Sequence, residues 1–533
     1  MKKRIFRILT QLKMMYINRF LWQPLIDRTH NPEKSQNDLL LQIIRKNQST
    51  VFGRKHGFDG VNSYDDFRSR VPVCEYETLR NYIEDQEKEK HPYLNIGQPV
   101  MYVQTSGTTD KPKLIPVLNS TINQYRKCQH MVAYGVYASY PEAYDGKVLA
   151  ITSPAVEGKT ETGTRYGAMS GLIYKSMPFL TRAKYVLPSS VFEINDYEKK
   201  YFEIAKLALA EKDITMIATA NPSTLIKLDR IINQDPNKII AEVSLINPLR
   251  GVELRQMYSD HNRLQFSQIW PNLRVITTWT GGNCGVLIPT LRKTVSNTTR
   301  FVELGYLASE FRGGITIDAV DNRQIPCLHE NFYEFVDRND WENNNPKFLT
   351  LSEVQSDRQY YIFVTTQNGL YRYHINDLVE VTGWFNNTPT IQFLQKGKGV
   401  TNLTGEKLCE NQLIEAMTCI TKSKQTDMGF FMMLGCVKKS RYTLYVESTN
   451  LDTNNLERCI AELNIEFKDK RKSNRLKPIK VVYLEEGTGE AYKKHCLNNG
   501  QREGQFKMLY LQYKNQCQFN FDAYAREERY AAA

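Results

Sequence analysis

The stretch that decides the fold is Thr105-Ser106-Gly107-Thr108-Thr109-Asp110-Lys111-Pro112-Lys113. An apolar, β-prone run at 99–104 precedes it, and a second short apolar run follows at 114–117. The pattern predicts a strand, then a loop rich in hydroxyl groups with one glycine, and a cation where the loop ends. The rest of the chain is organised around this loop.

Such a loop suits a polyphosphate ligand. Gly107 lets backbone N–H groups approach phosphate closely, and Lys113 adds positive charge. The hydroxyls able to donate to phosphate oxygens belong to Thr105, Ser106, Thr108 and Thr109. The other common phosphate-binding pattern, G-x-x-x-x-G-K-[ST], does not occur in the chain. A surface turn ahead of a solvated Lys-Pro-Lys explains the same residue types equally well, so residue types alone leave both interpretations open.

The string resembles the phosphate-binding signature of adenylate-forming enzymes, the superfamily of acyl-CoA ligases, firefly luciferase and peptide-synthetase adenylation domains. A more specific similarity is to the acyl-acid amido synthetases of the Gretchen Hagen-three family, in their bacterial form. Further blocks resemble this family and follow in its order, at 47–57 with 64–68 and 71–73, at 305–310, at 371–377 and at 402–408. Together, the ordered blocks identify the chain as a member.

Bulk composition fits a globular enzyme. With 533 residues, 41% of them hydrophobic, the chain can bury a large core and divide into two or more domains. Its ten cysteines include no C-x-x-C pair, so the sequence indicates neither a zinc site nor a disulfide framework, and a cytoplasmic location is the simplest. The basic residues that give the net charge of +12 are interleaved with 58 acidic residues. We interpret them as solvated surface and expect no nucleic-acid partner. The oligomeric state is left open.

The N-terminal segment predicts an amphipathic helix. It begins Lys2-Lys3-Arg4, and apolar residues then recur at helical spacing. Charges interrupt the apolar run and no small-residue cleavage site follows, which argues against a signal peptide or a membrane span. We expect this helix to dock on its own domain; contact of a basic helix with a membrane surface is the less favoured alternative.

The middle of the chain has the order of strands, loops and helices that is typical of a doubly wound α/β fold. Apolar runs at 147–153, 214–220 and 273–280 predict buried strands, each ending in a polar loop where ligands gather. The third run leads into Gly281-Gly282, a pair that permits close backbone approach to a flat ring or ribose. A plain β-turn accounts for the two glycines equally well.

The block Gly305-Tyr-Leu-Ala-Ser-Glu310 combines an aromatic face with a hard carboxylate oxygen. By residue type, Tyr306 can stack on a ring and Glu310 can bind Mg²⁺. The family resemblance implies that Tyr306 stacks on adenine and that Glu310 meets the metal near the phosphates. Ser309, in the same block, is assigned with them to the nucleotide site.

Short alternating strands between 315 and 381 predict a β-rich subdomain of the large domain. Within it, the block 371–377 ends in Asp377, expected in a turn between strands at 370–373 and 378–382, where its carboxylate can accept hydrogen bonds from both ribose hydroxyls. Many family members have glycine before this aspartate. Asn376 stands here instead, and asparagine tolerates the same left-handed backbone. His374 is interpreted as structural.

A hinge is predicted where glycine and lysine gather, at 392–400. The family places an arginine here that reaches the nucleotide; this chain offers Lys396 or Lys398, and Lys398 is assigned to the nucleotide site. The expected division is a large N-terminal domain, 1–397, and a small mobile α+β domain, 398–533. Near its end, Gly504-Gln-Phe-Lys507 resembles the family's terminal lysine motif, which implies that Lys507 neutralises the α-phosphate.

The resemblance implies an ATP-dependent ligase that uses Mg²⁺. A carboxylic acid is adenylated, and an amine, of an amino acid in this interpretation, then displaces AMP to form an amide. Lys113 and Lys507 are the catalytic candidates, because positioning and charge neutralisation supply the rate. Two alternatives stay open: an enzyme of the same superfamily that forms a coenzyme A thioester, and a non-catalytic binding or effector protein that keeps the fold.

Overall fold

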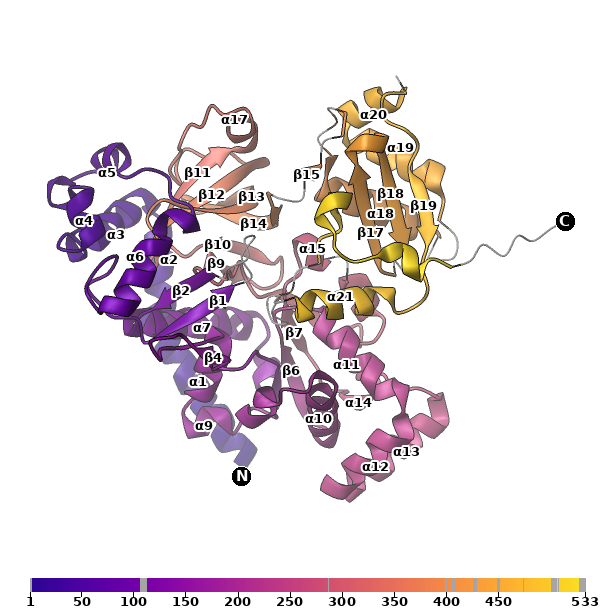
Figure 1. Ribbon diagram of the computed structural model, residues 1–533. Coiled ribbons are helices and arrows are strands. Elements are labelled where there is room, and N and C mark those ends of the chain that lie inside the picture. The colour runs from indigo at the N-terminus through magenta and orange to yellow at the C-terminus, as the bar shows by residue number, and fades with distance from the viewer. Residues whose placement is uncertain are drawn as a thin grey trace. The chain divides into compact units, whose positions relative to one another are not determined.

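The computed structural model describes most of the chain (Figure 1). The described residues are 2–105, 113–285, 287–397, 400–401, 403–404, 406, 408–424, 429–447, 451–472, 474–499, 506 and 508–526. They group into two compact units. The N-terminal unit comprises Met1–Gly281, Leu287–Ile375 and Val379–Phe393, and the C-terminal unit comprises Gly282–Val286, Asn376–Leu378 and Leu394–Ala533.

A four-stranded parallel sheet lies in the N-terminal unit. Its order is β3 (Lys147–Ala150), β6 (Ile214–Ala218), β7 (Val275–Thr278) and β8 (Arg300–Glu303). Every residue of β7 is buried, as are the first four of β6. Parallel strands covered on both faces read as continuous apolar runs, which is why the sequence predicted them. The α/β fold class is confirmed.

Helices connect these strands. The longer ones are α10 (Tyr197–Ala210), α11 (Ser223–Gln234), α12 (Pro236–Ile246) and α13 (Pro248–His261). Three of them begin after a short polar residue, Asp196, Asp235 or Asn247, whose side chain accepts a hydrogen bond from a first-turn amide. Such caps satisfy backbone donors that the helix itself leaves unpaired.

A second sheet carries the predicted phosphate hairpin. Its order is β2 (Lys113–Val117), β1 (Met101–Thr105), β5 (Arg165–Gly167) and β4 (Gly158–Lys159). The pair β1 and β2 is antiparallel, whereas β1 and β5 run parallel. The long helix α7 (Asn119–Ser139) follows β2 and contacts β9.

The predicted β-rich region consists of one two-stranded and one four-stranded sheet. The first pairs β9 (Gly314–Asp318) with β10 (Arg323–Pro326); the second has the order β11 (Asn331–Asp337), β12 (Arg358–Thr366), β13 (Tyr373–Phe385) and β14 (Thr388–Lys396). One expectation was wrong: Asp377 does not lie in a turn between two strands, because residues 370–372 form no strand and β13 runs from Tyr373 through Asp377 to Phe385. Asn376 takes a positive φ of 60° without ending the strand.

Helices make up the beginning of the N-terminal unit: α1 (Lys2–Ile17), the π-helical turn η1 (Asn18–Trp22), α2 (Gln23–Thr29), α3 (Pro32–Lys46), α4 (Val51–Lys55), α5 (Tyr64–Arg70) and α6 (Tyr76–Glu89). Helix α1 docks through the buried side chains of Met14 and Ile17, but Leu12 and Met15 on another side are exposed. Among the described residues, no helix combines the length and apolar character needed to cross a membrane.

Shorter helical elements lie between the strands and longer helices of this unit, except α15, which belongs to the C-terminal unit. They are η2 (Phe58–Gly60), η3 (Pro141–Tyr144), α8 (Met169–Lys175), α9 (Phe179–Arg182), η4 (Ser189–Glu193), α14 (Phe266–Ile269), α15 (Gly282–Gly285), α16 (Ile288–Arg292) and α17 (Arg338–Glu342).

The C-terminal unit is α+β. Its main sheet has the order β19 (Lys480–Tyr483), β18 (Arg441–Val446), β17 (Phe431–Cys436) and β20 (Leu511–Tyr513), and β15 (Val400–Thr401) pairs with β16 (Leu408–Cys409). Its helical elements are α18 (Glu410–Lys424), η5 (Val437–Lys439), α19 (Thr453–Leu463), α20 (Ile465–Lys472), α21 (Thr488–Asn498), η7 (Lys514–Gln516) and η8 (Phe521–Tyr524). Side chains of α18, α19 and the sheet form its own buried core.

Candidate active site

The hairpin of β1 and β2 frames the predicted phosphate loop. Thr105 is the last residue of β1 and pairs in register with Lys113, the first residue of β2. The connecting residues 106–112 lie outside the described residues, and with them Ser106, Gly107, Thr108 and Thr109. The flanking strands and the lysine at the end of the loop are as the sequence predicted.

Tyr76 fixes the start of β2. Its hydroxyl accepts a hydrogen bond from the amide of Leu114 (2.7 Å) and lies 3.2 Å from the Leu114 carbonyl oxygen, to which it donates. The Nζ atom of Lys113 lies 5.5 Å from the centroid of the Tyr76 ring. Burial raises the pKa of Tyr76 to about 12, so the phenol is neutral at physiological pH. A cation over an aromatic face is thereby held at the end of the loop.

A tight turn presents Glu310. The turn begins at Gly305, whose φ of 94° favours glycine, and it closes where the Tyr306 carbonyl accepts a hydrogen bond from the amide of Gly313 at 2.9 Å. Ser309 and Glu310 lie at the tip and are partly exposed. The tip therefore offers a carboxylate oxygen of the kind that Mg²⁺ prefers.

The ring of Tyr306 is buried and has aromatic neighbours. It stacks on Phe393 with a centroid separation of 5.6 Å and an interplanar angle of 21°, and it meets Phe311 edge-on at 5.5 Å. A Cβ atom at Gly313 would lie 2.1 Å from the ring, so only glycine fits against it. The stacking of adenine on Tyr306 stays a prediction. It requires Phe393 to move or the base to meet the ring edge.

The buried carboxylate of Glu303 ties two predicted nucleotide segments together. One oxygen accepts hydrogen bonds from the amide (2.6 Å) and hydroxyl (2.7 Å) of Thr280 and from the amide of Gly281 (3.2 Å). The other accepts from the amide of Gly305 at 3.0 Å. Glu303 thus fixes the turn after β7 and the start of the turn that carries Tyr306.

The backbone of Gly281 lies close to β14. A Cβ atom there would lie 3.2 Å from the side-chain amide nitrogen of Gln392 and 3.4 Å from the carbonyl oxygen of Phe393. Gly282 has a φ of 55° and begins α15. The close approach of this glycine pair to a ring or ribose stays a prediction; in the protein, Gly281 lies close to Gln392 and Phe393.

Asp377 is buried next to a lysine. Only 1% of its side chain is exposed, and its Oδ1 atom lies 2.5 Å from Nζ of Lys396. The left-handed backbone expected at Asn376 is present, and its carbonyl accepts a hydrogen bond from the amide of Gly397 at 2.9 Å. Of the two lysines considered for the family's arginine position, Lys396 contacts the aspartate. Lys398 lies outside the described residues, as does Lys507.

A buried ion pair that the sequence did not reveal supports the 371–377 block. The guanidinium of Arg372 lies 2.9 Å from Oε1 of Glu334, both side chains being 5% exposed or less. Arg372 also donates to the carbonyl of Val71 at 2.9 Å, and Tyr64 donates to Glu334 at 2.9 Å. This network joins the N-terminal helical segment to β11 and to the residue just before β13.

In the C-terminal unit, Glu406 fixes the backbone at Leu403 and Thr404. Its carboxylate accepts hydrogen bonds from the amides of Leu403 (2.7 Å) and Thr404 (2.8 Å) and from the hydroxyl of Tyr442 (2.5 Å). Burial alone would raise the pKa of this carboxyl, but the hydrogen bonds outweigh it and hold the pKa below its ordinary value. Glu406 is therefore ionised and fixed at neutral pH.

Comparison with known proteins decides the family. Residues 23–300 match the GH3 family N-terminal domain, 325–396 the GH3 family central domain and 411–516 the GH3 family C-terminal domain. The chain belongs to the GH3 family. The resemblance inferred from the ordered sequence blocks is confirmed.

Curated relatives of this GH3 protein span nearly its whole length. Indole-3-acetic acid-amido synthetase GH3.8 of Oryza sativa subsp. indica is 22% identical over 90% of this chain and 88% of its own. Indole-3-acetic acid-amido synthetase GH3.4 of Arabidopsis thaliana is 21% identical over 90% of this chain and 89% of its own. The predicted enzyme class, a ligase that forms C–N bonds, agrees with these names.

Solved structures confirm the fold. The GH3.15 acyl acid amido synthetase aligns with a TM-score of 0.81 at 20% identity, covering 94% of this chain and 95% of that one. A 2-hydroxyisobutyryl-CoA ligase aligns with a TM-score of 0.55 at 12% identity, covering 92% of each chain. The GH3 chain therefore has the fold of adenylate-forming enzymes.

The described groups of this GH3 protein suit binding and charge neutralisation better than nucleophilic attack. Lys113 supplies a cation, Glu310 a metal-binding oxygen and Asp377 a buried acceptor. Sequence reasoning missed Glu303 and Arg372. The signal for Glu303 was an acidic residue at the end of a buried strand, two residues before the Gly305 block.

Proposed function

We propose that the protein is an ATP-dependent acyl-acid amido synthetase. In the first half-reaction, a carboxylate oxygen of the acid bonds to the α-phosphorus of ATP and pyrophosphate leaves. In the second, an amino nitrogen bonds to the acyl carbon, AMP leaves, and the nitrogen loses a proton. The observation that carries the proposal is the match of all three GH3 domains, in order, in a chain whose relatives are named amido synthetases.

The proposed contacts with ATP rest on the geometry of the described residues. Lys113, held at the end of its loop by Tyr76, faces the phosphates together with the loop hydroxyls. The carboxylate of Asp377 accepts hydrogen bonds from the ribose hydroxyls, next to Lys396. The other residues proposed for the nucleotide are Thr105, Ser106, Gly107, Thr108, Thr109, Gly281, Gly282, Tyr306, Ser309 and Lys398.

Mg²⁺ is proposed to bind at Glu310. The carboxylate lies at the tip of the turn that begins at Gly305 and is partly exposed, which fits a cation that takes few protein ligands and shares phosphate oxygens. When bound, Mg²⁺ neutralises charge on the phosphates. Glu303 positions this turn through its hydrogen bond to Gly305.

Lys507 is proposed to neutralise the α-phosphate in the adenylation step. It belongs to a small C-terminal domain, which we propose begins at residue 398 and moves between the two half-reactions. The Lys507→Ala variant should slow pyrophosphate exchange severely and leave attack of the amine on a supplied acyl-adenylate nearly unchanged. Equal losses in both half-reactions would assign Lys507 a structural role instead.

The reaction itself is tested by product analysis. The full chain is incubated with Mg·ATP, a panel of aryl and alkyl carboxylic acids and the twenty common amino acids, and amides are detected by mass spectrometry. A parallel reaction contains coenzyme A in place of the amino acids. Amide formation with release of AMP is expected; thioester formation without amide would instead identify an acyl-CoA ligase.

A cytoplasmic location is proposed from the state of the cysteines. All ten are free thiols, seven of them buried, as is usual in a reducing compartment. Fractionation of the source cells, followed by detection with an antibody to this chain, tests the location. Recovery in a membrane fraction at high salt would favour the alternative that α1 contacts a membrane.

A further inference from the structure

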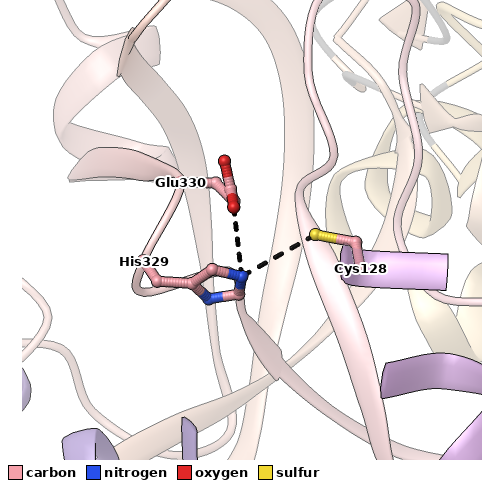
Figure 2. Close-up of side chains that lie close together, drawn as sticks. All are labelled: Cys128, His329 and Glu330. Atoms are coloured by element: carbon pink, nitrogen blue, oxygen red, sulfur yellow. Dashed lines mark hydrogen bonds and ion pairs between the residues drawn. The ribbon is translucent and has the colours of Figure 1, made fainter. Parts of the chain in front are cut away.

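A cluster of potential metal ligands lies in the N-terminal unit, apart from the residues assigned to ATP (Figure 2). Cys128 comes from the middle of α7, and His329 and Glu330 come from the turn between β10 and β11. Cys128 and Glu330 are buried, and the His329 side chain is 17% exposed. Their sulfur, nitrogen and oxygen atoms all lie within 4.8 Å of one another.

The distances resemble the edges of a metal-centred tetrahedron. Nε2 of His329 lies 3.8 Å from Sγ of Cys128 and 3.2 Å from Oε1 of Glu330. Zn²⁺ bound at its usual distances would separate a sulfur and a nitrogen ligand by about 3.5 Å and a nitrogen and an oxygen ligand by about 3.3 Å. Small side-chain shifts therefore suffice to bring the three atoms onto one ion.

The arrangement differs from that of a cysteine nucleophile. In a catalytic triad, one imidazole nitrogen faces the thiol and the other faces the carboxylate. Here, as Figure 2 shows, the thiol and the carboxylate both approach Nε2 of His329. The other nitrogen, Nδ1, is buried and has no hydrogen-bond partner among the described residues. Three ligand atoms within 4.8 Å of one another fit a shared cation better than a proton relay.

Cys327 lies in the same turn, two residues before His329, and is fully buried. Its sulfur is not among the atoms that lie within 4.8 Å of one another, so the cluster offers three protein ligands. Sulfur, nitrogen and oxygen ligands of these types all bind Zn²⁺, and three of them leave the fourth position to water.

We propose that Cys128, His329 and Glu330 bind one Zn²⁺ that fastens α7 to the turn between β10 and β11. The sequence, which lacks a C-x-x-C pair, did not indicate this site, because the fold brings Cys128 to two ligands that are distant from it in the sequence, His329 and Glu330. The turn between β10 and β11 is hydrogen-bonded to the end of the turn that carries Glu310, because the amide of Cys327 donates to the Gly313 carbonyl at 3.3 Å. The proposed ion therefore stabilises the turn that carries Glu310.

A second contact connects the proposed ion to this hairpin. Tyr125 lies one turn before Cys128 on α7, and its hydroxyl donates to the carbonyl of Ala308 at 3.4 Å. Loss of the ion should thus lower the melting temperature of the full chain and loosen the 305–313 hairpin. Neither effect requires the ion to take part in catalysis.

The test uses the reduced full-length protein, stripped with a chelator and then titrated with Zn²⁺ in competition with a chromogenic chelator. We expect one Zn²⁺ per chain. Loss of a ligand in Cys128→Ser or His329→Ala should weaken binding by more than the roughly 10- to 100-fold that loss of an outer-shell partner costs. Cys74→Ser is the matched control, because Cys74 is a buried thiol of the same unit whose sulfur donates to the carbonyl of Pro72.

Cobalt substitution keeps the test independent of how the variants fold. Stripped wild-type protein loaded with Co²⁺ should show sulfur-to-cobalt charge-transfer absorption, which Zn²⁺ displaces and which Cys74→Ser retains. The proposal is overturned if reduced wild-type protein binds no Zn²⁺ and shows no such absorption. It is equally overturned if Cys128→Ser binds Zn²⁺ as tightly as wild type does. In either case Cys128, His329 and Glu330 would be a hydrogen-bonded cluster without a metal.

Discussion

Glu303→Gln is the substitution that best tests whether Glu303 positions the turn that begins at Gly305. The side chain keeps its length, but one carboxylate oxygen becomes an NH₂ group that cannot accept a hydrogen bond. In the protein, one oxygen accepts three hydrogen bonds, from Thr280 and Gly281, and the other accepts one from Gly305. The variant should therefore keep its amide oxygen toward Thr280 and release Gly305.

The expected loss of free energy follows from the number of hydrogen bonds that the substitution removes or weakens. One hydrogen bond to a charged acceptor is lost, worth about 1.5–3 kcal/mol, and the three others become hydrogen bonds to a neutral acceptor. Because Gly305 begins the turn that carries Tyr306 and Glu310, part of this free energy should be lost from nucleotide binding. Each 1.4 kcal/mol lost there raises the dissociation constant for ATP about tenfold.

The assay pairs calorimetric titration with ATP and thermal unfolding monitored by fluorescence. Glu303→Gln should bind ATP about tenfold or more weakly and melt at a lower temperature than wild type. Glu75→Gln is the control, since the side chain of Glu75 is 73% exposed. Unchanged ATP affinity in Glu303→Gln, with a lowered melting temperature, would show that the Gly305 turn does not contact the nucleotide. Unchanged values in both measurements would refute the reasoning altogether.

Three further predictions concern buried charges. Asp377→Ala should weaken ATP binding in calorimetric titration by roughly 1.5–3 kcal/mol per charged hydrogen bond lost; unchanged affinity in a folded variant would remove Asp377 from the site. Arg372→Met should lower the free energy of unfolding in urea by about 3–5 kcal/mol, because it leaves the carboxylate of Glu334 buried and unpaired. Adding Glu334→Leu should restore part of that loss, and an Arg372→Met protein as stable as wild type would contradict the prediction. Because its hydrogen bonds hold the pKa of Glu406 below the unfolded value of about 4.3, the stability this carboxylate contributes is present above that pH and is lost as the pH falls through the folded pKa. The difference in melting temperature between wild type and Glu406→Gln should therefore be largest at neutral pH and narrow in acid, and a constant difference would contradict it.

The sequence predicted the elements whose signals are local. Strands β6 and β7 are uninterrupted apolar runs, and the β1–β2 hairpin frames a loop with a recognisable pattern of hydroxyls and glycine. Asn376 has the left-handed backbone expected of an asparagine that replaces glycine. The ordered blocks were enough to identify the GH3 family, because each block combines several residue types in a fixed order.

Features that depend on distant partners were not predictable. Glu303 meets donors at Thr280 and Gly281, and no local pattern shows that the two segments lie side by side. Helix α19 ends at Leu463 and α20 begins at Ile465, on either side of Asn464. The side chain of Asn464 accepts a hydrogen bond from the amide of Phe467 (2.8 Å) and donates to the carbonyl of Glu406 (2.9 Å), so a tertiary contact starts the second helix.

The measurement that tests the central claim most directly is exchange of radiolabelled pyrophosphate into ATP, with and without a carboxylic acid. Exchange should require an acid and Mg²⁺, and in Lys113→Ala it should fall by about 10²–10³-fold, the loss typical when one charge-stabilising group is removed from an active site. Exchange that persists unchanged in Lys113→Ala would contradict the assigned phosphate site. No exchange with any acid of a broad panel, by a folded protein that binds ATP, would contradict the account of this protein as an adenylate-forming amido synthetase.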